Sequence, residues 1–301
     1  MNQLLIKNGA SPALIGAAYM VFAGVLFALV NISVQGAAMH YGLPSSSVAF
    51  LQYAIALIFG ATWLARLGWK SFATENMALH ILRVLAAAAG VQLWVLGLKY
   101  VPIWQAIALI MTSPFFVTLG ASLFLRESVS LQRWLATLIG FAGGMIILAP
   151  WSDSFTVAAL YPLAAAALWA FASLLTKRLT KTEAPDTVTA YLLVLLTPIN
   201  AVFASFEGFV VPTGTALWLI LLAGGLTALA QLALTRAYAV SDASYVQPFD
   251  HLKLPLNVLF GWLAFQFVPG GNLWIGAALI VGASMYILRQ ESREQKGFVG
   301  R

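Results

Sequence analysis

Three ionisable side chains stand close together in an apolar part of the chain, where they could bind or carry a solute. Asp250, His251 and Lys253 lie within the segment from Ala243 to Phe267, which is long enough to cross a bilayer. A helix that enters the membrane near Ala243 would place Lys253 about 15 Å deep, close to the midplane, at about 1.5 Å per residue. Because a charge at that depth costs at least about 2.5–3.5 kcal/mol, an ionisable residue there is a functional candidate by default.

Polar residues at helical spacing accompany this charge. Gln247, Asp250 and Asn257 share one helix face, and Lys253 follows Asp250 by three residues. Asp250 and Lys253 either line a substrate cavity or neutralise each other and only lock helix packing. His251 could titrate near neutral pH, which would suit proton coupling. Two prolines in the same turns remove backbone donors and free carbonyl groups.

The third apolar segment carries a second ionisable pair. His80 and Arg83 are three residues apart and share a face near the predicted cytoplasmic entry of that segment. The Arg83 guanidinium could receive a substrate carboxylate through two hydrogen bonds. Alternatively, its long side chain reaches back to the membrane interface and has no role in binding.

Neutral amides occur within other apolar segments. Gln92 and Gln231 lie at similar depth in segments that the internal repeat relates to each other. Asn31 and Gln35 lie one turn apart on the first segment. Either pair could hydrogen-bond a substrate, or its members could bond each other across the bundle.

Aromatic residues are abundant, and many of them stand at segment ends, where interfacial anchoring explains them. Tyr100 and Trp104 lie together near the predicted outer ends of two segments, where a ring could stack on a flat substrate or an ammonium group. Trp104 also fits an interfacial belt. Tyr238 is the repeat counterpart of Tyr100, and Trp169 lies about fourteen residues into its segment, too deep for a belt. Trp169 either packs between helices or lines a cavity.

Composition defines the class of protein. The chain has 301 residues, of which 61% are hydrophobic and 9% charged, and its mean hydropathy is +0.89. Soluble domains carry about 25% charged residues, so we expect an all-α integral membrane protein. The net charge of +6 comes from basic residues scattered among loops, so no nucleic-acid partner is expected. The chain has no cysteine, and we expect neither a metal nor a cofactor.

Ten apolar segments can be counted. Their approximate ranges are 12–35, 45–67, 77–98, 103–125, 131–150, 155–177, 187–206, 214–239, 243–267 and 272–290. With both termini inside, cytoplasmic loops and tails hold thirteen of the sixteen lysines and arginines, and outer loops hold only Lys99. A missing or extra span would reverse every later loop, so this asymmetry predicts ten transmembrane helices with both termini cytoplasmic. We expect a multi-pass protein of the cytoplasmic (plasma or inner) membrane.

The two halves of the sequence repeat each other. Trp134-Leu135 in the first half recurs as Trp274-Ile275 at an offset of 140. Each half contains five segments, an odd number, so the second half must be inverted relative to the first. This predicts two inverted five-helix repeats around a central cavity, at residues 1–150 and 151–290, and a cytoplasmic tail at 291–301.

Several short motifs resemble the drug/metabolite transporter superfamily of EamA type. They are the segment ends Leu98-Lys99-Tyr100 and Ala237-Tyr238, the helix ending Phe124-Leu125-Arg126-Glu127, glycines 140, 143 and 144, and Leu168-Trp169-Ala170. The second repeat departs from the family pattern, because Ala264-Phe265-Gln266 replaces the usual Gly-Glu ending. The resemblance implies ten helices in two inverted repeats, and within the family the chain is most similar to YddG-type exporters of aromatic amino acids and related metabolites.

We therefore expect a secondary transporter that exports small amphipathic metabolites, aromatic amino acids above all, by alternating access. The alternatives are an exporter or permease for organic cations and drugs, and a facilitative channel. No nucleotide-binding loop of the form Gly-x-x-x-x-Gly-Lys-Ser/Thr occurs, and no metalloprotease or serine-hydrolase motif occurs, so an enzyme is not expected. The expected partners are the small-molecule substrate and the lipid bilayer. A monomer is the working expectation, and the sequence leaves the oligomeric state open.

Overall fold

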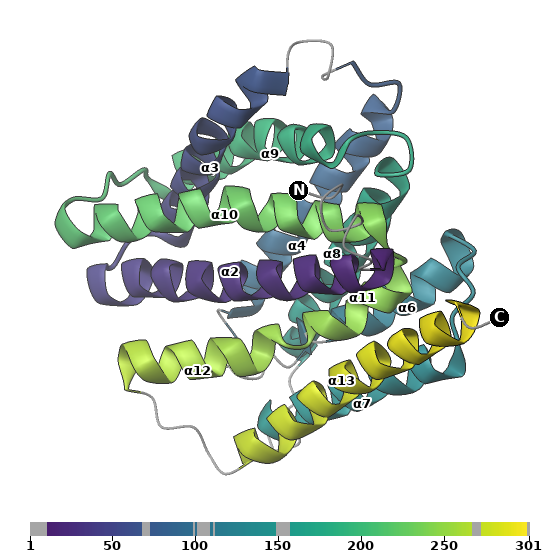
Figure 1. Cartoon of the computed structure of the whole chain (residues 1–301). Coiled ribbons are helices and arrows are strands. Elements are labelled where there is room, and N and C mark those ends of the chain that lie inside the picture. The colour runs from purple at the N-terminus through teal and green to yellow at the C-terminus, as the bar shows by residue number, and fades with distance from the viewer. Residues whose placement is uncertain are drawn as a thin grey trace.

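The computed structural model describes residues 11–67, 73–98, 100, 109–110, 112–148, 157–266 and 272–299. Within these ranges the chain is helical and contains no strand (Figure 1). The helices are α2 (Pro12–Tyr41), α3 (Ser45–Leu67), α4 (Met77–Leu98), α6 (Ser113–Phe124), α7 (Leu131–Leu148), α8 (Leu160–Leu179), α9 (Pro185–Glu207), α10 (Gly214–Val240), α11 (Ala243–Asp250), α12 (Lys253–Phe265) and α13 (Asn272–Val299), with a 3₁₀ turn at Val157–Ala159.

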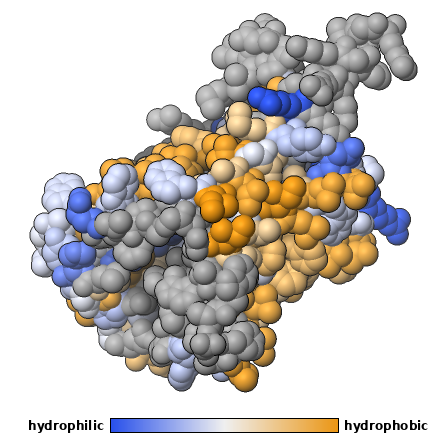
Figure 2. Space-filling view, turned by 90° about the horizontal axis from the view of Figure 1, so that it is seen from below, coloured by the Kyte–Doolittle hydropathy of each residue, from blue (hydrophilic) through white to orange (hydrophobic). Residues whose placement is uncertain are grey.

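Five of these helices, namely α2, α4, α8, α9 and α10, contain stretches long and apolar enough to cross a membrane. Shorter apolar stretches occur in α3, α6 and α13. Figure 2 shows the resulting surface, on which apolar side chains form a broad region and hydrophilic side chains gather toward its edges. This arrangement is typical of a protein whose sides face lipid.

The ends of α2 follow from its sequence. Ser11 precedes the helix, and its hydroxyl accepts a hydrogen bond from the Leu14 N–H at 3.1 Å. Pro12 occupies the first turn, where its missing N–H costs nothing. The helix ends at Gly42, whose φ of 63° is a left-handed conformation that glycine adopts without strain. At 30 residues, α2 is about 45 Å long and has Phe27 near its middle.

The main helix contacts pair one half of the chain with the other. The most extensive are α2 with α10, α4 with α8, α7 with α13, and α3 with α9. If the halves are aligned segment by segment, the α2–α10 contact corresponds to α8–α4, and the α3–α9 and α7–α13 contacts correspond to themselves. The packing therefore has the pattern that a two-fold repeat requires, and the inverted orientation of the halves stays a prediction.

The segment 243–267, expected from the sequence as one helix, is divided in two. His251 and Leu252 form a turn between α11 and α12. Pro255 explains the division, because it lacks the N–H that would bond the His251 carbonyl and its ring would clash with that carbonyl. The Leu254 N–H reaches the same carbonyl instead, at 3.1 Å. The break places Lys253 at the first residue of α12.

Local backbone features recur at the offset found in the sequence. The N–H groups of Thr112 and Leu252, 140 residues apart, each bond the carbonyl three residues back at 3.1 Å. Arg126 and Gln266 are also 140 residues apart, and they are the non-glycine residues of the described chain with positive φ, at 55° and 57°. These matches support an internal repeat that extends to backbone conformation.

One end of the bundle, called the basic end below, collects the charged residues. It holds the starts of α2, α4, α7, α9 and α11 and the ends of α3, α6, α8, α10 and α13, several of which lie at the right of Figure 1. The basic residues described at this end include Arg126, Arg133, Lys177, Arg178, Lys181, Arg236 and Arg289. The described turns at the opposite end contain no lysine or arginine. This distribution has the form expected of a cytoplasmic end.

Candidate functional site

The ion pair between Lys253 and Asp250 is formed in the structure. Their side chains keep 20% and 14% of their surface exposed, so the pair is not sealed between helices. The Lys253 ammonium lies 5.0 Å from the centre of the Phe27 ring on α2, which is within range of a cation–π contact. Lys253 also lies close to Gly24 on α2, where a Cβ would be 3.4 Å from Lys253 Cγ, an ordinary van der Waals contact.

Two asparagines extend the same group across α2 and α12. The Asn31 amide donates to Asn257 Oδ1 at 3.0 Å, and the Asn257 amide donates to the Lys253 carbonyl at 2.6 Å. Phe27, Asn31, Asp250, Lys253 and Asn257 are called the central polar group below. Asn31 is exposed and Asn257 half-buried. An exposed amide and a partly exposed ion pair at the break within an apolar segment indicate contact with water rather than with lipid.

This group offers a defined set of chemical contacts. The Lys253 ammonium has three donors, and Asp250 takes up one of them. The two asparagines can each supply a donor and an acceptor. Phe27 presents a flat apolar face. The arrangement suits an aromatic solute whose edge carries both donors and acceptors.

Gln247, Tyr238 and His251 are buried between helices. The Tyr238 hydroxyl donates to Gln247 Oε1 at 2.9 Å, which connects α10 to α11. The His251 ring is 1% exposed and lies against α7. A Cβ at Gly140 would come within 2.6 Å of His251 Cδ2, so glycine is required at that position. The predicted substrate contacts of these three residues stay predictions.

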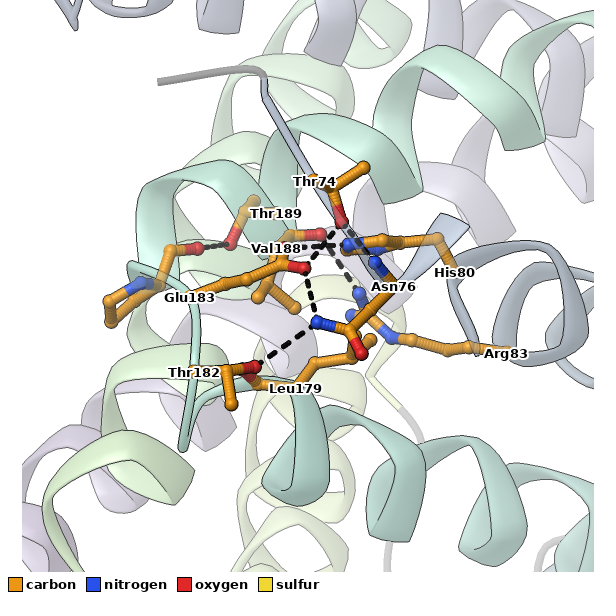
Figure 3. A network of polar contacts seen from close by, with 10 residues as sticks. Thr74, Asn76, His80, Arg83, Leu179, Thr182, Glu183, Val188 and Thr189 are labelled. Atoms are coloured by element: carbon orange, nitrogen blue, oxygen red, sulfur yellow. Dashed lines mark hydrogen bonds and ion pairs between the residues drawn. The ribbon is translucent and has the colours of Figure 1, made fainter. Parts of the chain in front are cut away.

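His80 and Arg83 belong to a polar network at the basic end (Figure 3). His80 Nε2 pairs with Glu183 Oε2 at 2.7 Å, and the His80 side chain is fully buried. Arg83 is 3% exposed and donates to the Val188 carbonyl at 2.9 Å. The His80 ring also lies 4.3 Å from the Tyr191 ring. Both side chains thus join α4 to the turn before α9 and to α9 itself.

Glu183 is the centre of this network. Its Oε1 accepts from the Thr74 hydroxyl at 2.5 Å and from the Asn76 amide at 3.1 Å, beside the His80 contact at Oε2. Burial favours the neutral form of the carboxyl, but these hydrogen bonds outweigh it, and the pKa of Glu183 is lowered from its usual value. Glu183 therefore fastens the chain before α4 to the turn between α8 and α9.

Trp169 packs between α4 and α8. Its indole N–H donates to the Ala87 carbonyl at 3.2 Å, and its ring lies 6.2 Å from that of Trp94. A Cβ at Gly90 would come within 2.5 Å of Trp169 Nε1. Of the two readings of Trp169, these contacts favour packing.

The remaining predicted residues are dispersed. Gln92 is half-buried on α4, and Gln231 is half-buried on α10 beside the Tyr53 hydroxyl. Tyr100 is 63% exposed. Trp104 lies outside the described residues. The structure thus brings Asp250, Lys253 and Asn257 together, and it gives the other predicted residues that it describes no contact with this group's amides or ammonium.

Sequence spacing did not assign two residues to the central polar group, Phe27 and Asn31. Phe27 was not singled out, because an aromatic residue in an apolar helix carries no signal of its own. Asn31 was noted, and its pairing with Asn257 depends on the packing of α2 against α12, 226 residues apart in sequence. A polar residue in the middle of the longest apolar helix was the signal that could have found it.

Both halves of the chain match one known family of membrane proteins. The model of the EamA-like transporter family matches residues 14–149 and again residues 156–289. The chain belongs to the EamA-like transporter family. It is therefore a multi-pass membrane transporter of small metabolites and not an enzyme.

Curated relatives cover almost the whole chain. A riboflavin transporter of Rhizobium johnstonii is 55% identical over 98% of each chain. A riboflavin transporter of Vibrio cholerae is 51% identical over 93% of this chain and 95% of its own. An S-adenosylmethionine uptake transporter of Rickettsia bellii is 27% identical over 89% of this chain and 93% of its own.

A solved crystal structure has the same fold. It superimposes with a TM-score of 0.76 over 94% of this chain and 98% of its own, at 21% identity.

Proposed function

We propose that this protein carries riboflavin across the cytoplasmic membrane by alternating access. The observation that carries the proposal is the identity of 51–55%, over more than nine tenths of the chain, to relatives named riboflavin transporters. More distant relatives are named for other substrates: S-adenosylmethionine uptake at 24–27% identity and pseudopaline export at 28% identity.

The aromatic amino-acid substrate predicted from the sequence finds no support in these relatives. That prediction rested on aromatic residues and on one charged helix, which are features that any carrier of flat polar solutes would share. Riboflavin has the same general character, because it combines a large flat ring system with a polar edge and a hydroxylated chain.

The central polar group matches the chemistry of riboflavin. The edge of the flavin ring presents a carbonyl, an N–H and a second carbonyl in a row. Asn31 and Asn257 can supply the complementary donors and acceptor once their mutual bond opens. The Lys253 ammonium can donate to a ring carbonyl or nitrogen, and Phe27 lies beside it to contact the ring face.

The predicted architecture supplies the transport cycle. Two inverted repeats around a midplane site can rock to expose that site to either side in turn. The basic end is the proposed cytoplasmic end. Export, the direction predicted from the sequence, and uptake use the same cycle, so the imposed gradient sets the direction of net flux.

Counterflow in proteoliposomes tests the proposal. Vesicles loaded with unlabelled riboflavin should accumulate labelled riboflavin transiently, with saturable kinetics. Phenylalanine, tryptophan and S-adenosylmethionine should neither drive counterflow nor compete. Counterflow driven by an amino acid, with none driven by riboflavin, would overturn the assignment and restore the substrate predicted from the sequence.

A further inference from the structure

The start of α11 is capped by a carboxylate from another helix. Glu127, which follows the end of α6, accepts the Ala243 N–H at Oε1 (3.1 Å) and the Ser244 N–H at Oε2 (3.0 Å). The Ser244 hydroxyl adds a bond to Oε2 at 2.9 Å. A carboxylate is favoured at this position because the first N–H groups of a helix have no partners of their own and carry partial positive charge. Glu127 thus ties the first half of the chain to α11, which leads directly to Asp250.

Two basic residues reinforce the same corner. The Arg133 guanidinium on α7 donates to Asp242 Oδ2 at 3.2 Å and to the Ser244 hydroxyl at 3.3 Å. The Lys177 ammonium at the end of α8 donates to the carbonyls of Tyr238 and Ser241 at the end of α10. The turn between α10 and α11 is therefore held from three helices.

Behind this corner lies the largest buried apolar cluster of the described chain. It joins the basic-end parts of α2, α6, α8, α10 and α11, and its most buried members include Met20, Val117, Ala237, Ala243 and Val246. Gly16 on α2 lets that helix approach the same corner, because a Cβ there would meet Ser241 Cβ at 2.5 Å. At the basic end the two halves are thus closed by packed apolar side chains, and Glu127 lies at the rim of that closure.

The sequence of the second repeat lacks the residue that makes this cap. Arg126 and Gln266 share their left-handed conformation at an offset of 140, so the repeat counterpart of Glu127 is position 267, which is Phe. A phenylalanine cannot accept hydrogen bonds from a helix start. The two ends of a carrier built from repeats therefore differ by one carboxylate.

We propose that Glu127 is the latch of the basic-end gate. It is a positioning residue that acts through α11: while its carboxylate holds the start of α11, the apolar cluster stays packed and the basic end stays closed. Opening toward the basic end requires these three bonds to break together. The inference deepens the proposed transport cycle, but it needs no particular substrate.

Thiol labelling tests the latch directly, because the chain has no cysteine of its own. Ala237→Cys places a reporter in the buried cluster, and Ala37→Cys places one in the separate buried cluster near the opposite end of α2. Glu127→Gln keeps the size of the side chain but removes its charge and one acceptor oxygen. We expect it to raise the maleimide labelling rate of the Ala237→Cys reporter roughly tenfold, as expected for the loss of charge-assisted hydrogen bonds. The Ala37→Cys reporter should not gain reactivity.

Two further variants keep the test decisive. Asp242→Asn weakens the exposed Arg133 pair at the same corner and leaves the cap intact, so it should leave labelling unchanged. Ser244→Ala removes one of the three bonds, together with one contact of Arg133, and should raise the labelling rate by less than tenfold. It provides the test should Glu127→Gln fail to fold. Protection of the Ala237→Cys reporter in folded Glu127→Gln, or in Ser244→Ala, to the level of the unchanged chain would overturn the latch. Because labelling requires no riboflavin, this result stands apart from the identity of the substrate.

Discussion

The central polar group and the Glu183 network differ in how completely their polar atoms are bonded. At the basic end, the Glu183 carboxylate receives contacts from Thr74, Asn76 and His80, and its side chain is 8% exposed. In the central polar group, Lys253 has one carboxylate partner for three donors, and Asn31 is exposed. A buried carboxylate with three bonded partners fixes a structure, whereas an exposed group with unused donors can take a ligand. Charged residues within an apolar bundle can thus serve two different purposes.

The largest effect is expected from the ion pair. Lys253→Ala or Asp250→Ala should lower riboflavin counterflow roughly 100-fold, because each removes a partner of a partly buried charge pair. The double variant Asp250→Ala, Lys253→Ala should regain thermal stability, because it leaves no buried charge without a partner. It should not regain transport, because the ligand contact of Lys253 is still missing. Counterflow and the Tm of the detergent-purified proteins measure both quantities. Recovery of transport in the double variant would show that the pair only locks packing.

The amide pair should have the next largest effect. Asn257→Ala should raise the half-saturating riboflavin concentration about tenfold, as expected for lost hydrogen bonds to the ligand. Ser33→Ala is the matched control, because Ser33 is buried on the same helix as Asn31 and its hydroxyl bonds the Leu29 carbonyl one turn back. An equal shift in both variants would argue for a general packing effect.

The Glu183 network should affect stability rather than transport. Glu183→Gln should lower the free energy of unfolding by about 1–3 kcal/mol, the cost of breaking hydrogen bonds to a buried charged group. The transport rate per folded molecule should stay unchanged. Both statements are checked by measuring Tm and by measuring counterflow in vesicles of matched protein content. A loss of transport at unchanged Tm would show that Glu183 takes part in transport.

The same carboxyl predicts a dependence of stability on pH. Because the pKa of Glu183 is lowered in the folded state, its stabilising contribution is fully present above its unfolded value near 4.5. The contribution is lost as the pH falls through the lower folded pKa. The Tm difference between the unchanged chain and Glu183→Gln should therefore be constant from neutral pH to about 5 and shrink below that. A difference that grows on acidification would contradict the sign.

The smallest effect is expected at Trp169. Trp169→Phe removes the bond to the Ala87 carbonyl and should cost about 1 kcal/mol of stability. Transport should be retained, because the ring packs between α4 and α8. A raised half-saturating concentration of riboflavin in this variant would instead place Trp169 in the substrate path.

Much of the architecture could be predicted from composition and periodicity. The apolar segments predicted most of the described helices, because a bilayer imposes length and hydrophobicity on every spanning helix. The division of the segment 243–267 was missed, although Pro255 was visible, because a proline near a break also fits a continuous kinked helix.

The candidate site was predicted only where its members are close in sequence. Asp250, Lys253 and Asn257 lie within eight residues of one another and could be grouped by helical spacing alone. The partners Phe27 and Asn31 come from a helix more than 200 residues earlier. His80 and Arg83 were grouped correctly by spacing, but their bonds to Glu183 and Val188 depend on how α4 meets α9. Spacing identifies residues on one face and does not identify what that face meets.

We propose that the central polar group is in contact with water and binds riboflavin. Asn31→Cys in the cysteine-free chain tests it most directly, with Ser33→Cys as the buried control on the same helix. We expect a charged, membrane-impermeant thiol reagent to label Asn31→Cys and not Ser33→Cys, and riboflavin to slow that labelling in a saturable manner. A thiol at position 31 that resists the reagent, or that reacts equally fast with and without riboflavin, would contradict the claim.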